Sequence, residues 1–142
     1  MNTPDSFPQT LSVDVAVVGG GAAGLSAGLV LARSRRSVVV VDAGEQRNLA
    51  AGHVHNYLTS EGMAPSEIVA QGRAEVESYG GQVVTGRVLS ATAHEGPHPS
   101  FTLALEDGRV VEARRVVIAT GAVDRLPDVP GIAERWGRDV LH

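Results

Sequence analysis

The sequence contains no cysteine and no lysine, because all 12 of its basic residues are arginines. Without cysteine, the chain by itself forms no disulfide, no thiolate nucleophile and no cysteine-ligated zinc site. Without lysine, it has neither the lysine of a P-loop nor an amine for Schiff-base chemistry. These two absences remove several common enzyme classes from consideration.

Long apolar runs and an excess of basic charge are also missing. The most apolar stretches, residues 15–18 and 38–41, are far shorter than the roughly 20 residues of a membrane-spanning helix. Residues 1–11 are polar and contain two prolines, so they lack the apolar core of a secretory signal. The formal net charge is -4 and the arginines are dispersed, which argues against nucleic-acid binding. We therefore expect a cytoplasmic protein that binds neither membrane nor nucleic acid.

The 142 residues are enough for one ordinary domain. We expect a flexible leader at residues 1–11 and a single domain at residues 12–142. Within it, residues 13–18 and 38–42 are short runs rich in valine, which is typical of buried parallel strands. Residues 22–33 are mostly alanine and leucine, as in a helix that packs closely on a sheet. Residues 12–42 are therefore predicted to form one βαβ unit.

The turn between the first strand and the helix carries a glycine pattern. Gly19, Gly21 and Gly24 match the spacing G-x-G-x-x-G, in the strand-turn-helix context that makes this pattern indicative of dinucleotide binding. Gly19 permits the turn, Gly21 leaves room for a pyrophosphate, and Gly24 allows close helix packing. The backbone N–H groups at the helix N-terminus, around Ala22 and Ala23, would then bind the phosphates without a lysine.

Asp42 completes the predicted site. It ends the second strand 18 positions after Gly24, close to the roughly 20 expected for the acidic residue that accepts hydrogen bonds from a ribose. Its charge would repel a 2′-phosphate. The alternative is that the glycines only form a tight turn and that Asp42 only ends a strand.

The remaining pattern predicts an α/β fold with a small antiparallel β insertion. Residues 43–64 show no clean periodicity and are expected to form a long loop. A helix is expected from Pro65 to about residue 79. Antiparallel strands are expected at 82–92, 100–105 and 109–113, the last two joined at Asp107-Gly108. Residues 115–119 read as a further buried strand.

Residues 118–121, Ile-Ala-Thr-Gly, follow this hairpin and resemble a segment of flavoproteins that use two dinucleotides. The order of elements is similar to that of the FAD domain of thioredoxin reductase, over residues 12–142. A narrower resemblance, to a bacterial thioredoxin-reductase-like branch, rests on residues 46–48, 53–58, 61–62 and 136–142.

The resemblance implies that the dinucleotide is FAD and that NADPH or NADH reduces the flavin. It places Asn56 near the flavin, the backbone of Val88 at the adenine, and Thr120 and Gly121 beside the FAD. No residue is a convincing catalytic acid, base or nucleophile, as expected where the chemistry belongs to the flavin. The implied fold is a Rossmann-like FAD-binding βαβ unit within an incomplete FAD domain.

The sequence departs from that family in one respect. The family's Cys-x-x-Cys pair follows shortly after the segment that matches residues 140–142, and the sequence stops there. We therefore expect the N-terminal portion of an FAD domain, with an unpaired sheet edge that pairs with a second copy or with a missing complementary segment.

Other interpretations remain open from the residues alone. The fingerprint would also suit a fragment of an NAD-binding dehydrogenase, or a non-catalytic nucleotide-binding module left by truncation. His53 and His55 could bind a metal, but no third ligand is near in sequence, so we predict no metal site. Arg33, Arg35 and Arg36 could contact a phosphate; we expect them to complement the negative end of the first helix.

Overall fold

The computed structural model describes residues 7–137, 139 and 140. Over these residues the chain forms a six-stranded sheet in the order β3-β2-β1-β6-β5-β4. The strands are β1 (Thr10–Val18), β2 (Val38–Asp42), β3 (Gln82–Thr85), β4 (Val88–His94), β5 (Ser100–Leu105) and β6 (Val110–Ile118). The helices are α1 (Ala22–Arg33), the 3-10 helix η1 (Arg47–Ala50), α2 (Pro65–Ser78) and α3 (Ile132–Arg135). The predicted α/β fold is confirmed.

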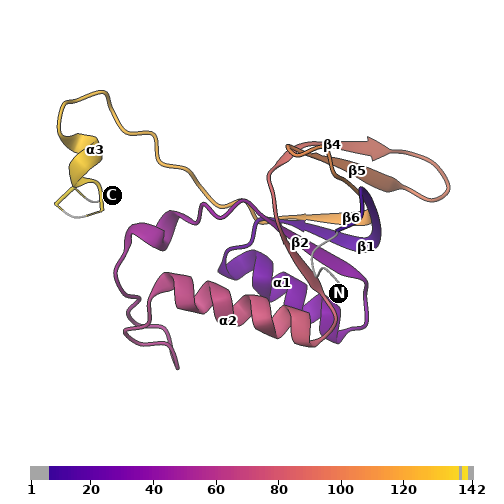
Figure 1. The fold of residues 1–142 in the computed structure, drawn as a ribbon, viewed down its shortest axis with the longest axis horizontal. Coiled ribbons are helices and arrows are strands. Elements are labelled where there is room, and N and C mark those ends of the chain that lie inside the picture. Colours follow the sequence, from indigo (N-terminus) through magenta and orange to yellow (C-terminus); the bar gives the residue numbers. More distant parts are fainter. Residues whose placement is uncertain (1–6, 138, 141–142) are drawn as a thin grey trace, which may run out of the picture.

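The predicted βαβ unit is formed by β1, α1 and β2. The two strands are parallel, with Val17 opposite Val40, and β3 and β6 extend the parallel part on either side. All five residues of β2 are buried, as expected of a strand covered on both faces. Helices α1 and α2 lie together against one face of this sheet (Figure 1), where Leu25 and Val76 join the valines in a core.

A second core lies on the other face of the sheet. Leu103 and Leu105 of β5 pack there with Val39, Val41 and Val111. The hairpin of β4 and β5 rises above the parallel strands on the side away from the helices (Figure 1). Full burial of one such leucine contributes about 1.5–3 kcal/mol, so this hairpin is a fixed part of the domain.

The prediction of one antiparallel strand at residues 82–92 is wrong. The segment divides at Gly86 and Arg87 into β3, which pairs in parallel with β2, and β4, which pairs antiparallel with β5. The Gly86 N–H donates to the carbonyl oxygen of Asp42 at 2.9 Å, which ends β3 beside the end of β2. The composition of the segment suits strands in both halves and so conceals the change of partner.

The two strands expected at residues 109–113 and 115–119 are one strand, β6. Its first part pairs antiparallel with β5 as far as Ala113, and it pairs in parallel with β1 along its length. Beyond Ala113, β6 pairs only with β1 among the described residues, and its other edge has no strand beside it. The unpaired sheet edge expected from the sequence is therefore confirmed for the described part of the chain, and Ile118 on it is exposed.

The boundary expected between residues 11 and 12 falls inside a strand, because β1 begins at Thr10. Before it, the Gln9 side chain donates to the carbonyl oxygen of Gly108 at 2.7 Å, and the guanidinium of Arg109 stacks over the ring of Phe7. Residues 1–6 lie outside the described residues, as do Arg138, Leu141 and His142 of the segment named in the resemblance.

Among the helices within the described ranges, none combines the length and apolar character needed to cross a membrane.

Candidate functional site

A cleft of about 430 Å³ opens at the carboxyl ends of the parallel strands. Its volume lies within the range of small-molecule sites. Strand β1 lies between β2 and β6, so the strands that follow β1 in the chain are added first on one side of it and later on the other. In open α/β sheets, ligands bind at the point where the strand order reverses in this way. Five segments line the cleft: residues 18–23, 41–43, 45–48, 86–88 and 119–123.

Gly19 and Gly24 close the turn between β1 and α1. Gly19 has a φ of 112°, and a Cβ on it would lie 2.2 Å from the carbonyl oxygen of Ala119. A Cβ on Gly24 would lie 1.8 Å from the carbonyl oxygen of Gly19. The turn therefore has no room for side chains at these positions, and the packing role predicted for Gly24 is confirmed. Gly24 itself does not line the cleft.

The N-terminus of α1 opens into the cleft. Gly21 is its N-cap residue, no side chain caps the helix, and no acidic residue lies in the first turn. The partial positive charge of the helix N-terminus is therefore not neutralised by the helix's own residues. A Cβ on Gly21 would meet only Cγ of Gln46, at 3.8 Å, so this face is open to an approaching group. The structure brings Gly19, Gly21, Ala22 and Ala23 together on the cleft wall at this helix end, and helix N-termini of this kind are suited to anions.

Asp42 lines the same cleft, yet it is only 5% exposed. One carboxylate oxygen, Oδ1, accepts hydrogen bonds from the Gly44 N–H and from the Gln46 amide, both at 2.9 Å. The other, Oδ2, accepts from the guanidinium of Arg73 at 3.1 Å. The structure thus places Asp42 beside the glycine turn, as the sequence predicts, but with protein donors already on both oxygens.

Two ion pairs fix the loop after β2 to opposite walls of the cleft. The Arg47 guanidinium donates to both carboxylate oxygens of Asp124, at 2.6 and 2.7 Å, and this bond raises the pKa of Arg47 above its ordinary value. Glu45 accepts a hydrogen bond from Arg87, on the link between β3 and β4, and the bond raises the pKa of Arg87. The loop is thereby tied to segments that follow β3 and β6.

Val88, Thr120 and Gly121, which the resemblance assigned to the cofactor, all line the cleft. The Ala119 N–H donates to the carbonyl oxygen of Val18 at 2.8 Å, so the Thr-Gly segment begins at the end of β1, beside the glycine turn. Gly121 has a φ of 67°, a conformation that favours glycine. Residues from three distant parts of the sequence therefore meet at this edge of the sheet.

Asn56 is not among the residues that line the cleft. It lies in the long loop with a φ of 59°, and its N–H donates to a carboxylate oxygen of Glu61 at 2.7 Å. The same carboxyl group bonds to His55, and the bond from His55 is the main reason that the pKa of Glu61 is lowered. The loop therefore folds on itself around Glu61, and the structure does not bring Asn56 to the glycine turn.

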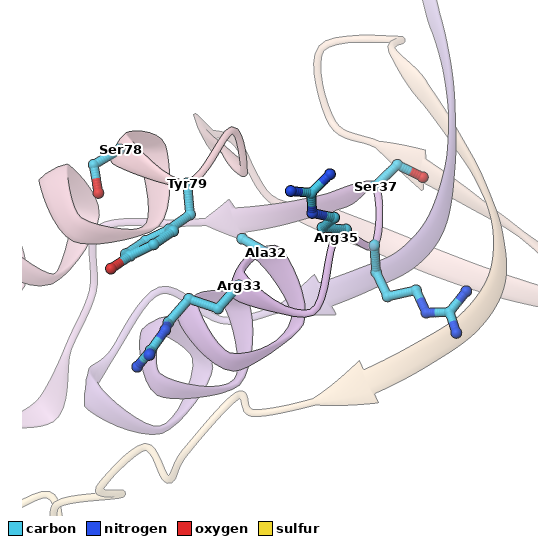
Figure 2. Close-up of a pocket in the computed structure, with 7 residues that line it drawn as sticks. Ala32, Arg33, Arg35, Ser37, Ser78 and Tyr79 are labelled. Atoms are coloured by element: carbon cyan, nitrogen blue, oxygen red, sulfur yellow. The ribbon is translucent and has the colours of Figure 1, made fainter.

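A second hollow, of about 580 Å³, lies at the opposite end of α1. Arg33, Arg35 and Arg36 line it, and the guanidinium groups of Arg33 and Arg35 point in different directions rather than toward a common point (Figure 2). The guanidinium of Arg33 stacks over the ring of Tyr79, and Arg33 lies in the last turn of α1. This arrangement fits the expected complement to the negative helix end better than a phosphate site.

Within the described ranges, no group of three or more histidine, aspartate or glutamate side chains is arranged to hold a metal ion. His55, one of the two histidines considered as ligands, is paired with Glu61.

Comparison with known proteins identifies the family to which this fold and cleft belong. Residues 13–141 match the family described as pyridine nucleotide-disulphide oxidoreductase. The chain belongs to this family. It is 36% identical over 131 residues to thioredoxin reductase tcpT of Claviceps purpurea, covering 92% of this chain and 41% of that protein. The resemblance to thioredoxin reductases is confirmed.

Two solved structures have the same fold. The crystal structure of HlmI matches with a TM-score of 0.88 and 48% identity, over 92% of this chain and 42% of that one. An oxidoreductase from Agrobacterium tumefaciens matches with a TM-score of 0.81 and 42% identity, over 90% of this chain and 43% of that one. The chain thus spans about two fifths of the length of these relatives.

Several residues in the cleft or bonded to it were not assigned a role from the sequence. Gly20 falls on a variable position of the glycine pattern, yet a Cβ there would lie 2.3 Å from the Cβ of Asp42. Gln46 and Arg73 hold the Asp42 carboxylate, but they are separated from it by 4 and 31 positions. Gln46 belongs to residues 46–48, which carry the narrower family resemblance, but that resemblance assigned it no role. Arg73 has no local signal, because an arginine on a helix is most often a solvated surface residue.

Proposed function

We propose that the cleft binds FAD and that the chain is the FAD-binding part of an NAD(P)H-dependent flavoprotein oxidoreductase similar to thioredoxin reductase. One observation carries the proposal. The uncapped N-terminus of α1, with Gly21 open toward the cleft, lies beside the carboxylate of Asp42. A cationic helix end next to a carboxylate matches the diphosphate and the adenosine sugar of a dinucleotide.

The residues present fit such a cofactor. The N–H groups from Gly21 to Ala23 would hold the pyrophosphate, and Asp42 would hold the ribose. Val88, Thr120 and Gly121, on the facing walls, would contact the rest of the FAD. The bound flavin would exchange hydride with a nicotinamide, and the role of this chain is to bind and orient it. Asn56 stays a prediction from the resemblance, since it lies outside the cleft lining.

The choice of FAD over NAD is supported by the family. Relatives from Claviceps purpurea and Leptosphaeria maculans, which match over most of this chain, both carry the name thioredoxin reductase. We propose, in addition, that residues 12–142 are the N-terminal portion of an FAD domain. The open edge of β6, at residues 114–118, fits pairing with another strand, from a second copy or from a complementary segment.

The test is FAD binding by the 142-residue chain and by Gly21→Ala. At Gly21 the backbone φ is -76° and the position is open, so alanine leaves the fold unchanged while its methyl group faces the phosphate position. We expect FAD affinity to fall at least about fivefold, since overpacking costs about 1–3 kcal/mol. Gly52→Ala is the matched control, because a Cβ there meets nothing within 4 Å.

The titration follows flavin fluorescence, and thermal unfolding checks that the variants remain folded. An unchanged affinity in a folded Gly21→Ala chain would contradict the proposed phosphate position. Binding of NAD without FAD would favour a dehydrogenase fragment, and binding of neither would favour a non-catalytic module.

A further inference from the structure

The carboxylate of Asp42 is closed off from the cleft by four groups. Gly20 packs against it, the Gly44 N–H and the Gln46 amide occupy Oδ1, and Arg73 occupies Oδ2. With 5% of the residue exposed, a sugar hydroxyl cannot reach this carboxylate as it stands. If Asp42 binds a ribose, one of the four groups has to leave.

These four groups differ in the free energy needed to displace them from the Asp42 carboxylate. Gly20 and the Gly44 N–H are backbone groups, so displacing either would distort the turn. Removing Arg73 would leave a buried carboxylate without its cationic partner, which is strongly unfavourable. The bond from Gln46 is neutral on the donor side, and its release needs side-chain rotation in a partly exposed residue and the loss of one long hydrogen bond, of 3.4 Å, to the carbonyl oxygen of Gly20. Gln46 is therefore the group whose displacement from the carboxylate costs the least free energy.

The backbone at Gln46 is held in place while its side chain can turn. The residues on either side are fixed by the pairs Glu45–Arg87 and Arg47–Asp124. The Gln46 amide also lies 3.4 Å from the carbonyl oxygen of Gly20, and its Cγ faces the open side of Gly21. The side chain thus reaches from the phosphate end of the cleft to the carboxylate without any movement of the loop.

We propose that Gln46 is a specificity-determining gate over Asp42, an inference that rests on the proposed dinucleotide site. Its amide donates to Oδ1 in this structure and is replaced there by a ribose hydroxyl, which donates to the same oxygen. Arg73 stays on Oδ2 and keeps the carboxylate oriented. A ligand without sugar hydroxyls has no donor to replace the amide, so it leaves the gate shut.

The gate is tested with ADP and with 2′,3′-dideoxy-ADP, which share adenine and diphosphate but differ in the sugar hydroxyls. Gln46→Ala removes the competing amide, so we expect it to bind ADP about three to ten times more tightly, the factor that corresponds to one net hydrogen bond. Its affinity for the dideoxy ligand should not change. Gln71→Ala, an exposed glutamine of α2 and the matched control, should change neither. Titration calorimetry gives both constants, and thermal unfolding confirms that each variant is folded.

A second readout follows the gate without any turnover. In the wild-type chain, the side-chain amide resonance of Gln46 should shift more on addition of ADP than of the dideoxy ligand, because both ligands place a diphosphate nearby but only ADP displaces the amide from Asp42. The gate is overturned if Gln46→Ala binds ADP more weakly than the wild type does. It is also overturned if the variant changes the affinities for ADP and for the dideoxy ligand by the same factor. Failure of both chains to bind ADP overturns it too, and removes the sugar site as well.

The two proposals can fail separately. If the expected ADP pattern appears in a chain that does not bind FAD, the gate stands and the flavin assignment falls. If FAD binds and Gln46→Ala leaves the ADP constant unchanged, the gate falls and the proposed function stands.

Discussion

Replacing Gly24 with alanine should destabilise the domain, although the same change inside a helix is usually stabilising. Helix propensity favours alanine over glycine by about 1 kcal/mol. At Gly24, however, the new Cβ would lie 1.8 Å from the carbonyl oxygen of Gly19. A carbon and a carbonyl oxygen need about 3.3 Å, so α1 and the turn would have to separate by about 1.5 Å. The atom in the way belongs to the backbone, and no side-chain rotation relieves the contact.

The expected cost is about 3 kcal/mol, typical of an overpacked core, and the propensity gain reduces it to about 2 kcal/mol. Gly72→Ala is the matched control, because Gly72 lies inside α2 and its Cβ would meet the Cδ1 of Leu25 at 3.1 Å. That atom is the end of a flexible side chain, so we expect the free energy of unfolding to stay within about 0.5 kcal/mol of the wild-type value or to rise slightly.

Urea unfolding followed by circular dichroism, without added nucleotide, measures both variants. The reasoning would be refuted if Gly24→Ala were as stable as the wild type, or if the two alanine variants lost equal stability.

Two further predictions concern the carboxylates. Asp42→Ala should lose about 1.5–3 kcal/mol of adenine dinucleotide binding, the range for a hydrogen bond to a charged group, and an unchanged constant in a titration would remove Asp42 from the site. Two hydrogen bonds lower the pKa of Asp14 below its ordinary value of 3.8, the larger effect coming from the Ser37 N–H and the smaller from the Ser37 hydroxyl. Ser37→Ala removes only the hydroxyl, so it should raise this pKa part of the way toward 3.8. Since the folded pKa is depressed, this contribution to stability is present above 3.8 and is lost as the pH falls through the folded pKa. An NMR titration of the Asp14 carboxyl carbon measures the shift, and an unaltered pKa would contradict the assigned cause.

The residues of the site that could be predicted from the sequence are those whose spacing along the chain forms a short local pattern. Gly19, Gly21 and Gly24 lie within one turn, and Asp42 follows at the end of the next strand, so one short window carries the pattern. The bounds of α1 and β2 were predicted correctly for the same reason, since each has one consistent composition between clear breaks.

The rest depended on pairing between distant segments, which composition does not specify. The valine pair in β3 is as suitable for a parallel edge as for a hairpin, so its partner was assigned wrongly. Arg114 was left between two predicted strands, yet β6 runs through it because an exposed strand position accepts an arginine. Arg73 reaches Asp42 only because α2 packs beside α1, which no local window shows.

The continuity of β6 limits where the chain can change in length. Because residues on both sides of Arg114 keep their register with β1, one inserted residue there would shift everything downstream against the glycine turn. The exposed link between β4 and β5, residues 95–99, carries no such restriction, since a longer loop leaves both strands in place. Homologues should therefore vary in the length of that link, while the spacing from Val110 to Thr120 stays constant.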